Sequence, residues 1–134
     1  MSNSLYAFGR QSLGTAAINL SSDTIQAVLC TATYVANLAT DQHLSDIAGG
    51  AQIATVTLTG QALTNGVFTA SNLVFGSVLA GSTITQMVLY KSTGVAATSA
   101  LIFLITQASG LPFPTDGGNI NVSWDTGVNG IFVI

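Results

Sequence analysis

Apolar and polar residues alternate over several short stretches of this chain, and a period of two is typical of β-strands. The cleanest alternation places Ala54, Val56 and Leu58 on one side of a stretch and threonines on the other, as expected for a strand with one face in solvent. Residues 24–30 begin with the same alternation but end with apolar residues on both sides. This second stretch predicts a strand that is covered on both faces.

Further short stretches with apolar residues two apart are also predicted to be strands. The dipeptide Asn65-Gly66 lies between two apolar pairs, and it favours the positive backbone angles of a tight hairpin turn. The remaining predicted strands are residues 15–20, 73–75, 84–90, 120–124 and 131–134.

The most hydrophobic block of the chain consists of Leu101, Ile102, Phe103, Leu104 and Ile105. Because it is apolar on both faces, it is expected to be a central strand, or a strand whose outer face meets another subunit. We therefore assign these five residues both to the core and to an interface between copies of the chain.

Two segments are predicted to lie outside the strands. Residues 109–118 contain two prolines and three glycines, which indicate an exposed loop. Residues 41–47 form a polar connection in which Thr40 or Ser45 could cap a single helical turn. No longer helix is predicted anywhere in the chain.

Short strands separated by glycine, asparagine and aspartate turns indicate an all-β fold, namely an antiparallel β-sandwich, of which the jelly roll is one form. A length of 134 residues fits one domain with one core. Residues 1–14 mix apolar side chains with glycine and polar positions, so they are expected to form an N-terminal arm. Residues 15–134 are expected to form a single β-sandwich domain.

Charged residues make up 5% of the chain, against roughly 25% in ordinary soluble domains. A surface with so few charges is weakly protected against association, so a partner protein is expected. Arg10 and Lys91 are the only Lys or Arg residues, too few to neutralise a run of phosphates or to bind an acidic membrane surface. Neither nucleic acid nor a membrane is therefore expected as a partner.

The first residues lack a basic start followed by an apolar run, so no secretory signal is expected. The longest apolar block is far shorter than the ~20 residues of a membrane helix. Cys30 is the single cysteine, which excludes an internal disulfide and is expected to be a small buried thiol. These features suit a protein made in a reducing cytoplasm.

Few side chains in the sequence can carry out acid–base or nucleophilic chemistry. His43 stands near Asp41 and Asp46, and its imidazole could in principle activate Ser45, but neighbours in a surface connection rarely form a catalytic site. Asp41 and Asp46 could share a calcium ion, yet the spacing of a dedicated calcium loop is missing. We expect no catalytic residue, no metal, no cofactor and no enzyme activity.

The aromatic residues are scattered along the sequence. Tyr6, Tyr34 or Phe113 could stack on a sugar, but their scatter favours core filling or subunit contacts. Trp124 lies on an alternating stretch, so it is predicted to be a core residue whose indole N–H donates to a backbone carbonyl.

Short motifs spread over most of the chain carry a family resemblance. One has the form Asp-Thr-Ile-x-Ala-x-Leu at residues 23–29, followed by Tyr34, Asn37-Leu38, Thr40-Asp41 and Leu44-Ser45-Asp46-Ile47. The others are Leu5-Tyr6 with Gly9-Arg10, Val88-Leu89-Tyr90-Lys91 with Thr93-Gly94, and Trp124-Asp125 with Gly130-Ile131. With these motifs the chain resembles small tailed-bacteriophage virion proteins of the capsid decoration or cement type.

The resemblance implies a homotrimer that binds the major capsid protein on the outer surface of the head and stabilises the head against the pressure of packaged DNA. Such a protein is made in the host cytoplasm and ends on the capsid surface. For the capsid contact we select the residues Leu5, Tyr6, Phe8 and Arg10 of the N-terminal arm. A tail or fibre component and a carbohydrate-binding β-sandwich module remain as alternatives.

Overall fold

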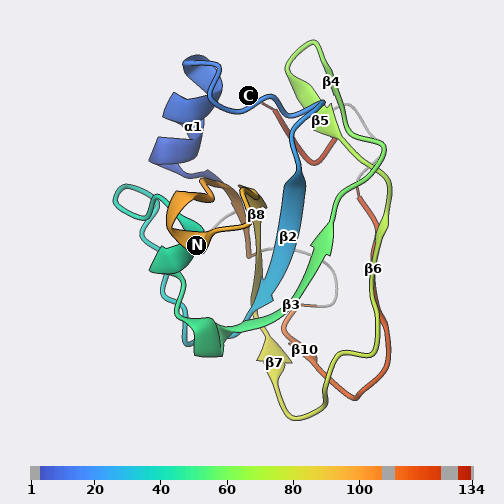
Figure 1. Ribbon diagram of the computed structural model, residues 1–134. Helices are drawn as coiled ribbons and strands as arrows, with labels where there is room; N and C mark the ends of the chain where they lie inside the picture. The colour runs from blue at the N-terminus through green and yellow to red at the C-terminus, as the bar shows by residue number, and fades with distance from the viewer. Residues whose placement is uncertain (1–3, 107–110, 125–129, 134) are drawn as a thin grey trace.

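The structure is a computed structural model that describes residues 4–106, 111–124 and 130–133. It is mostly β, with one short α-helix (Figure 1). The elements are β1 (Ser4–Leu5), α1 (Ala7–Gly14), β2 (Ile25–Cys30), β3 (Gln52–Thr57), β4 (Ala62–Thr64), β5 (Val67–Thr69), β6 (Leu73–Phe75), β7 (Thr83–Ile84), β8 (Gln86–Lys91), β9 (Leu101–Ile105), β10 (Phe113–Pro114), β11 (Ile120–Val122) and β12 (Phe132–Val133). The predicted all-β, sandwich-like class is confirmed.

The largest sheet has five strands in the order β1-β9-β8-β2-β3. Its strands pair antiparallel, and Val28 in β2 lies opposite Val88 of β8 on one side and Thr55 of β3 on the other. The predicted strand at residues 24–30 and the predicted strand around Ala54 and Val56 are therefore neighbours in this sheet.

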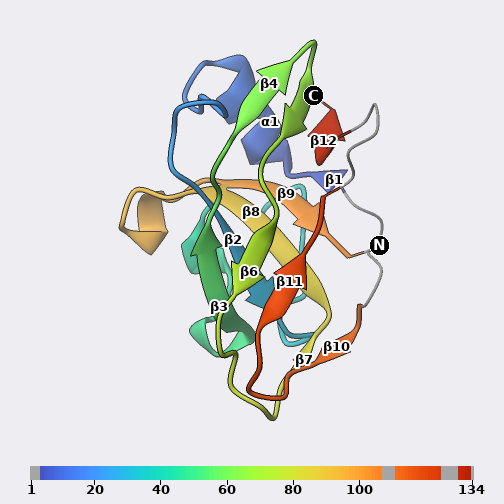
Figure 2. The same cartoon turned by 90° about the vertical axis from the view of Figure 1, so that its right-hand side faces the viewer.

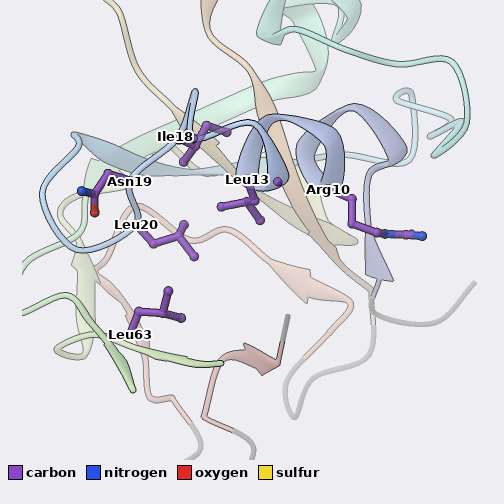
Figure 3. Close-up of a pocket in the computed structure, with 8 residues that line it drawn as sticks. Arg10, Leu13, Ile18, Asn19, Leu20 and Leu63 are labelled. Atoms are coloured by element: carbon purple, nitrogen blue, oxygen red, sulfur yellow. The ribbon is translucent and has the colours of Figure 1, made fainter. Parts of the chain in front are cut away.

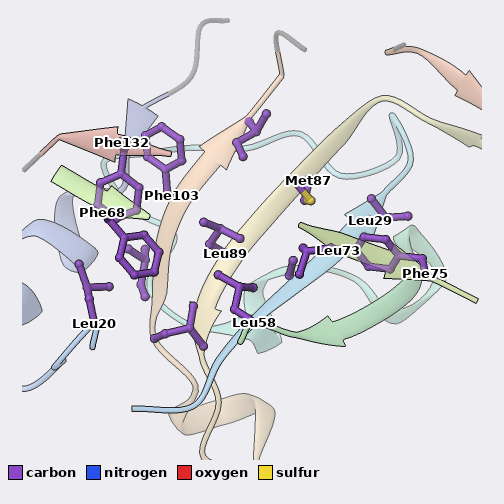
Figure 4. Close-up of a cluster of buried hydrophobic side chains, with 14 of the residues drawn as sticks. Leu20, Leu29, Leu58, Phe68, Leu73, Phe75, Met87, Leu89, Phe103 and Phe132 are labelled. Atoms are coloured by element: carbon purple, nitrogen blue, oxygen red, sulfur yellow. The ribbon is translucent and has the colours of Figure 1, made fainter. Parts of the chain in front are cut away.

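Three small antiparallel sheets lie over one face of the five-stranded sheet. They are β12-β5-β4, β11-β6 and β10-β7, and Figure 2 shows β6 and β11 in front of β2 and β8. The two layers meet in the larger core cluster (Figure 4). In this cluster the Phe103 ring stacks on the Phe132 ring at 4.7 Å between centroids, and Phe132 lies 5.2 Å from Phe68.

The opposite face of the five-stranded sheet is covered by residues 31–51, a segment that contains two short 3₁₀ turns, Leu44–Asp46 and Gly49–Ala51. Side chains from this segment and from the sheet form a second buried cluster, which includes Val28, Cys30, Tyr34, Ile47, Val88 and Leu104. The expectation that β2 is covered on both faces is therefore confirmed, and so is the buried state of the Cys30 thiol.

The tight hairpin predicted at Asn65-Gly66 is confirmed. It joins β4 to β5, and the φ angles of Asn65 and Gly66 are 51° and 81°, as a two-residue hairpin turn requires. The indole N–H of Trp124 donates to the Ser71 carbonyl at 3.0 Å, as predicted. Trp124 itself is half-buried at the margin of the larger core and follows the end of β11, so the prediction of a core residue is only partly correct.

One predicted strand is absent and another is interrupted. Residues 15–20 form no strand, because their backbone groups serve local turns: Ala17 N–H donates to Ser12 O, and Asp23 N–H donates to Asn19 O. The stretch 84–90 is broken at Thr85, whose N–H donates to Cys30 O. The chain therefore passes from the small sheet with β7 to the large sheet with β8 at this residue.

The predicted loop at residues 109–118 contains a short strand. Phe113 pairs with Ile84, and Pro114 pairs with Thr83, so β10 adds to the second layer, while residues 109 and 110 lie outside the described part of the chain. Pro114 fits because both strands of a two-stranded sheet are edge strands. The proline nitrogen, which has no hydrogen to donate, can therefore face away from the partner strand.

The prediction that the chain has no helix longer than a single turn is also wrong, because residues 7–14 form α1 directly after β1. Two glycines lower the helix propensity of this segment, but its packing against the start of β9 outweighs that cost. A Cβ atom on Gly9 would lie 2.6 Å from Leu101 O and 2.8 Å from Ile102 Cα. Gly9 therefore lets the helix approach the strand backbone. No helix among the described residues is long and apolar enough to cross a membrane.

The close approach of α1 to β9 gives a direct test. Gly9→Ala should lower the free energy of unfolding by about 1–3 kcal/mol, because the added methyl overpacks against backbone that cannot move aside. Gly14→Ala is the matched control in the same helix, since no atom lies within 4 Å of its added Cβ, and it should raise stability by up to about 1 kcal/mol. Urea unfolding of both variants measures the difference, and equal stabilities would contradict the packing.

Candidate functional site

His43 and Asp46, two of the residues considered for acid–base chemistry, interact with different neighbours through their side chains. The Asp46 carboxylate accepts the N–H groups of Gln42 at 2.7 Å and His43 at 3.1 Å, and these bonds lower its pKa. The His43 ring lies against Phe8, with 5.1 Å between ring centroids. His43 is therefore the N-cap residue of the turn Leu44–Asp46, and Asp46 at the third position accepts its N–H, so neither of the predicted residues, Thr40 or Ser45, caps this turn.

Asp41 belongs to a chain of hydrogen-bonded side chains that begins in the core, which we call the tyrosine network: Tyr6, Tyr34 and Asp41. The Tyr6 and Tyr34 hydroxyl oxygens are 2.6 Å apart, and the Tyr34 hydroxyl donates to Asp41 Oδ2 at 2.8 Å. Asn37 N–H donates to the same carboxylate oxygen at 2.9 Å. Burial raises the pKa of both tyrosines above the ordinary value of 10.0, so the network holds its protons and fastens residues 31–51 to the sheet.

The remaining reactive side chain, Cys30, lies inside the second cluster. Burial raises the pKa of its thiol to about 12, and a neutral thiol is a poor nucleophile. No three His, Cys, Asp or Glu side chains of the described ranges come together as metal ligands.

The four residues selected for a capsid contact lie in very different environments. Tyr6 is 0% exposed, so its ring cannot touch another protein. Leu5 is half-buried in β1, opposite Phe103, and Phe8 is half-buried against His43. Arg10 alone is exposed on α1. A contact through this region would therefore use Arg10 together with exposed residues near it. The sequence did not identify those neighbouring residues.

The five residues of β9 assigned to core and interface are all buried within the single chain, and none is more than 6% exposed. One face packs under the second β layer, and Leu101 and Leu104 pack in the second cluster. The core assignment therefore agrees with the structure. These side chains present almost no area to a second copy, so an interface between copies needs other residues.

The two most exposed large apolar side chains of the described residues lie between strands, where the sequence pattern gave no signal for them. Val35 is 83% exposed and Leu79 is 80% exposed. Tyr34 O accepts a bond from Gln86 at the start of β8, and the turn around Leu79 leads into β7 just before that strand. Both residues are therefore close in the sequence to residues at the end of the sheet where β2 finishes and β8 begins.

Two hollows lie beside the core. The larger, about 560 Å³, opens between the five-stranded sheet and β10 and β11, and Leu29, Met87, Phe113 and Ile120 line it. The smaller, about 340 Å³, lies between the end of α1 and β4 (Figure 3). We call the smaller one the α1–β4 groove. Arg10, Leu13, Leu20 and Leu63 are among its lining residues.

Comparison with known proteins gives no assignment. No protein-family model matches the chain, and no curated protein matches it.

The tyrosine network predicts a specific loss of stability. Tyr34→Phe removes the hydroxyl that links Tyr6 to Asp41, and two polar groups lose a partner, so the free energy of unfolding should fall by about 1–3 kcal/mol. Tyr90→Phe is the control, since its hydroxyl lies outside the network and donates to Gln26 at 2.6 Å, and its loss should cost about 0.5–1.5 kcal/mol. Chemical denaturation measures both, and a Tyr34→Phe protein as stable as the parent would remove the network's structural role.

Alkaline pH should also destabilise the protein. The folded state raises the pKa of Tyr6 and Tyr34 above 10.0 and that of Cys30 above 9.0, so the unfolded chain releases these protons first. Stability is then complete below about pH 9 and falls as the pH rises through the unfolded values. Denaturation at pH 8 to 11 should show this fall, and a Tyr6→Phe, Tyr34→Phe double variant should show a smaller one. A parent protein whose stability stays constant up to pH 11 would contradict this expectation.

Proposed function

We propose that this chain is a structural protein of a bacteriophage virion that decorates the outer surface of the head and cements it. The virion location, the homotrimer and the major capsid protein as partner follow from the motif resemblance. The structure supports the part of the proposal that calls for assembly with other proteins.

The observation that carries the proposal is a surface almost without ionised side chains. The chain has a charged fraction of 5%, and Lys91 and Asp23 neutralise each other at 3.2 Å. Large apolar side chains such as Val35 and Leu79 stand out into solvent. Such a surface opposes association weakly when the protein is free, and it loses little solvation free energy when another protein covers it.

In this proposal the protein cements the head by mass action, because its binding favours the assembled capsid. A protein that binds assembled capsid and not separated subunits stabilises the assembled state by its own binding free energy. Each copy that covers a joint between capsid proteins adds to the resistance against DNA pressure. Thr-rich and apolar surface suits this task because neither needs a charged partner to be buried.

A carbohydrate-binding module is the less favoured function. Sugar-binding platforms use exposed aromatic rings, whereas the ten aromatic residues of this chain are all described and all buried or half-buried. The alternative of a tail or fibre component would use the same charge-poor surface, and the choice between head and tail comes from the resemblance alone.

Virions with and without the protein test the proposal. Particles that lack it should release DNA at a temperature several degrees lower, because the capsid loses the binding free energy of the cement. Dye access to the genome during heating measures release, and adding the purified protein back should restore the parental midpoint. Equal heat resistance of the two particles would reject cementing, and failure of the protein to bind particles at all would reject the virion role.

A further inference from the structure

The second β layer carries apolar side chains on its outer face, where an antiparallel sheet in contact with solvent is normally polar. In β6, Leu73 and Phe75 are buried in the larger core, and Val74 between them is 53% exposed. In β12, Phe132 is buried and Val133 is 48% exposed. Both strands are therefore apolar on their two faces, as β2 and β9 are, but the chain covers only their inner face.

Strand pairing places the two exposed valines in rows with further uncharged side chains. Val133 of β12 lies opposite Val67 of β5, and Val67 lies opposite Thr64 of β4. Val74 of β6 lies opposite Asn121 of β11. Side chains that lie opposite each other in paired strands share one face of the sheet. We call these five residues the outer β face, and Figure 2 views β5, β6 and β11 from this side.

The strands of this layer carry no charge. Residues 47–90 contain no Asp, Glu, Lys, Arg or His, and β10, β11 and β12 contain none either. The charged residues that the structure describes lie in α1, before β2, at the end of β8, in residues 31–51 and in the turn between β10 and β11, namely Arg10, Asp23, Lys91, Asp41, Asp46 and Asp116. Asp116 therefore lies in a turn of the second layer, and the others lie outside this layer.

We propose that copies of this chain associate with one another through the outer β face. Two copies with a net charge of −3 repel each other, and at physiological salt this repulsion falls off over about 8 Å. The repulsion is therefore weakest where uncharged strands form the contact. Burial of Val74 and Val133 against another copy removes apolar surface from water and leaves no ion without a partner.

This inference rests on the proposed function for the homotrimer, and it supplies a contact surface in place of the buried strand β9. Copies around a threefold axis can all turn the same face toward that axis. The choice of surface rests on the exposed valines and on the uncharged strands that hold them.

Other surfaces and partners suit this contact less well. The exposed side chains of Val35, Leu79 and Val95 lie in connections between strands, whereas Val74 and Val133 lie in paired strands. Paired strands lose less conformational freedom on association than connections do. A partner of different sequence is recognised largely through complementary charges, and the outer β face offers none. A second copy is therefore the favoured occupant.

Sedimentation velocity and native mass spectrometry of the purified protein test the inference. At micromolar concentration the parent should have a mass close to three times the 13.6 kDa of one chain. Val74→Asp and Asn121→Asp should each weaken the association about tenfold or more, because each places a carboxylate without a partner in the contact and adds like charge there. Val35→Asp is the matched control, since it adds the same charge at a side chain that is 83% exposed, and it should leave the association unchanged.

Thermal melts check that the variants fold, and Asn121→Asp, which keeps the size of an exposed side chain, decides the result if Val74→Asp does not. A monomeric parent that still binds heads would overturn the inference while the proposed function stands. A Val35→Asp protein weakened as much as the other two variants would also overturn it.

Co-sedimentation with heads that lack the protein separates the two proposals. Outer-face variants that stay assembled would overturn the inference, and a loss of head binding in them would assign the outer β face to the capsid protein. A parent that assembles, comes apart in both outer-face variants and does not bind heads would support the inference and reject the proposed function.

Discussion

The burial of the five-stranded sheet on both faces is the constraint on which the rest of the structure depends. The strands β2, β8 and β9 carry apolar side chains on both sides, so neither face can be left to water. One face is covered by a second β layer, as in other sandwiches. The other is covered by residues 31–51, which have almost no regular structure. A chain of 134 residues therefore builds three layers, and this leaves few residues for separate functional loops.

An irregular cover must satisfy its own polar groups, and here it uses the sheet to do so. Gln86 donates to the carbonyls of Thr31 and Tyr34, and Leu44 N–H donates to Ser99 O. The tyrosine network adds a buried link from Tyr6, next to β1, to Asp41 in the cover. Because buried polar groups without partners are costly, these bonds make the position of residues 31–51 specific. Asp41, one of the candidates for chemistry in the sequence, takes part in this attachment.

Much of the fold could be predicted from the sequence, because strand patterns and turn dipeptides are local signals. The alternation around Ala54 and Val56, the hairpin at Asn65-Gly66 and the doubly covered β2 were all predicted correctly. The helix α1 was missed because Gly9 looks like a helix breaker until the close approach to β9 is known. The α1–β4 groove was missed for a related reason: Leu13, Leu20 and Leu63 come from three elements, and no local pattern brings them together.

The scarcity of charge has two consequences that operate together. Spread over the whole molecule, it leaves an outer surface that other proteins can cover at little cost in desolvation, since few ions have to leave water. Within the chain, it leaves each described ion bound to a local partner. Lys91 pairs with Asp23, and each of the four described aspartates accepts a backbone N–H of a nearby residue. These carboxylates therefore fix turns of the backbone, because an N–H bonded to a carboxylate is held more firmly than one bonded to water.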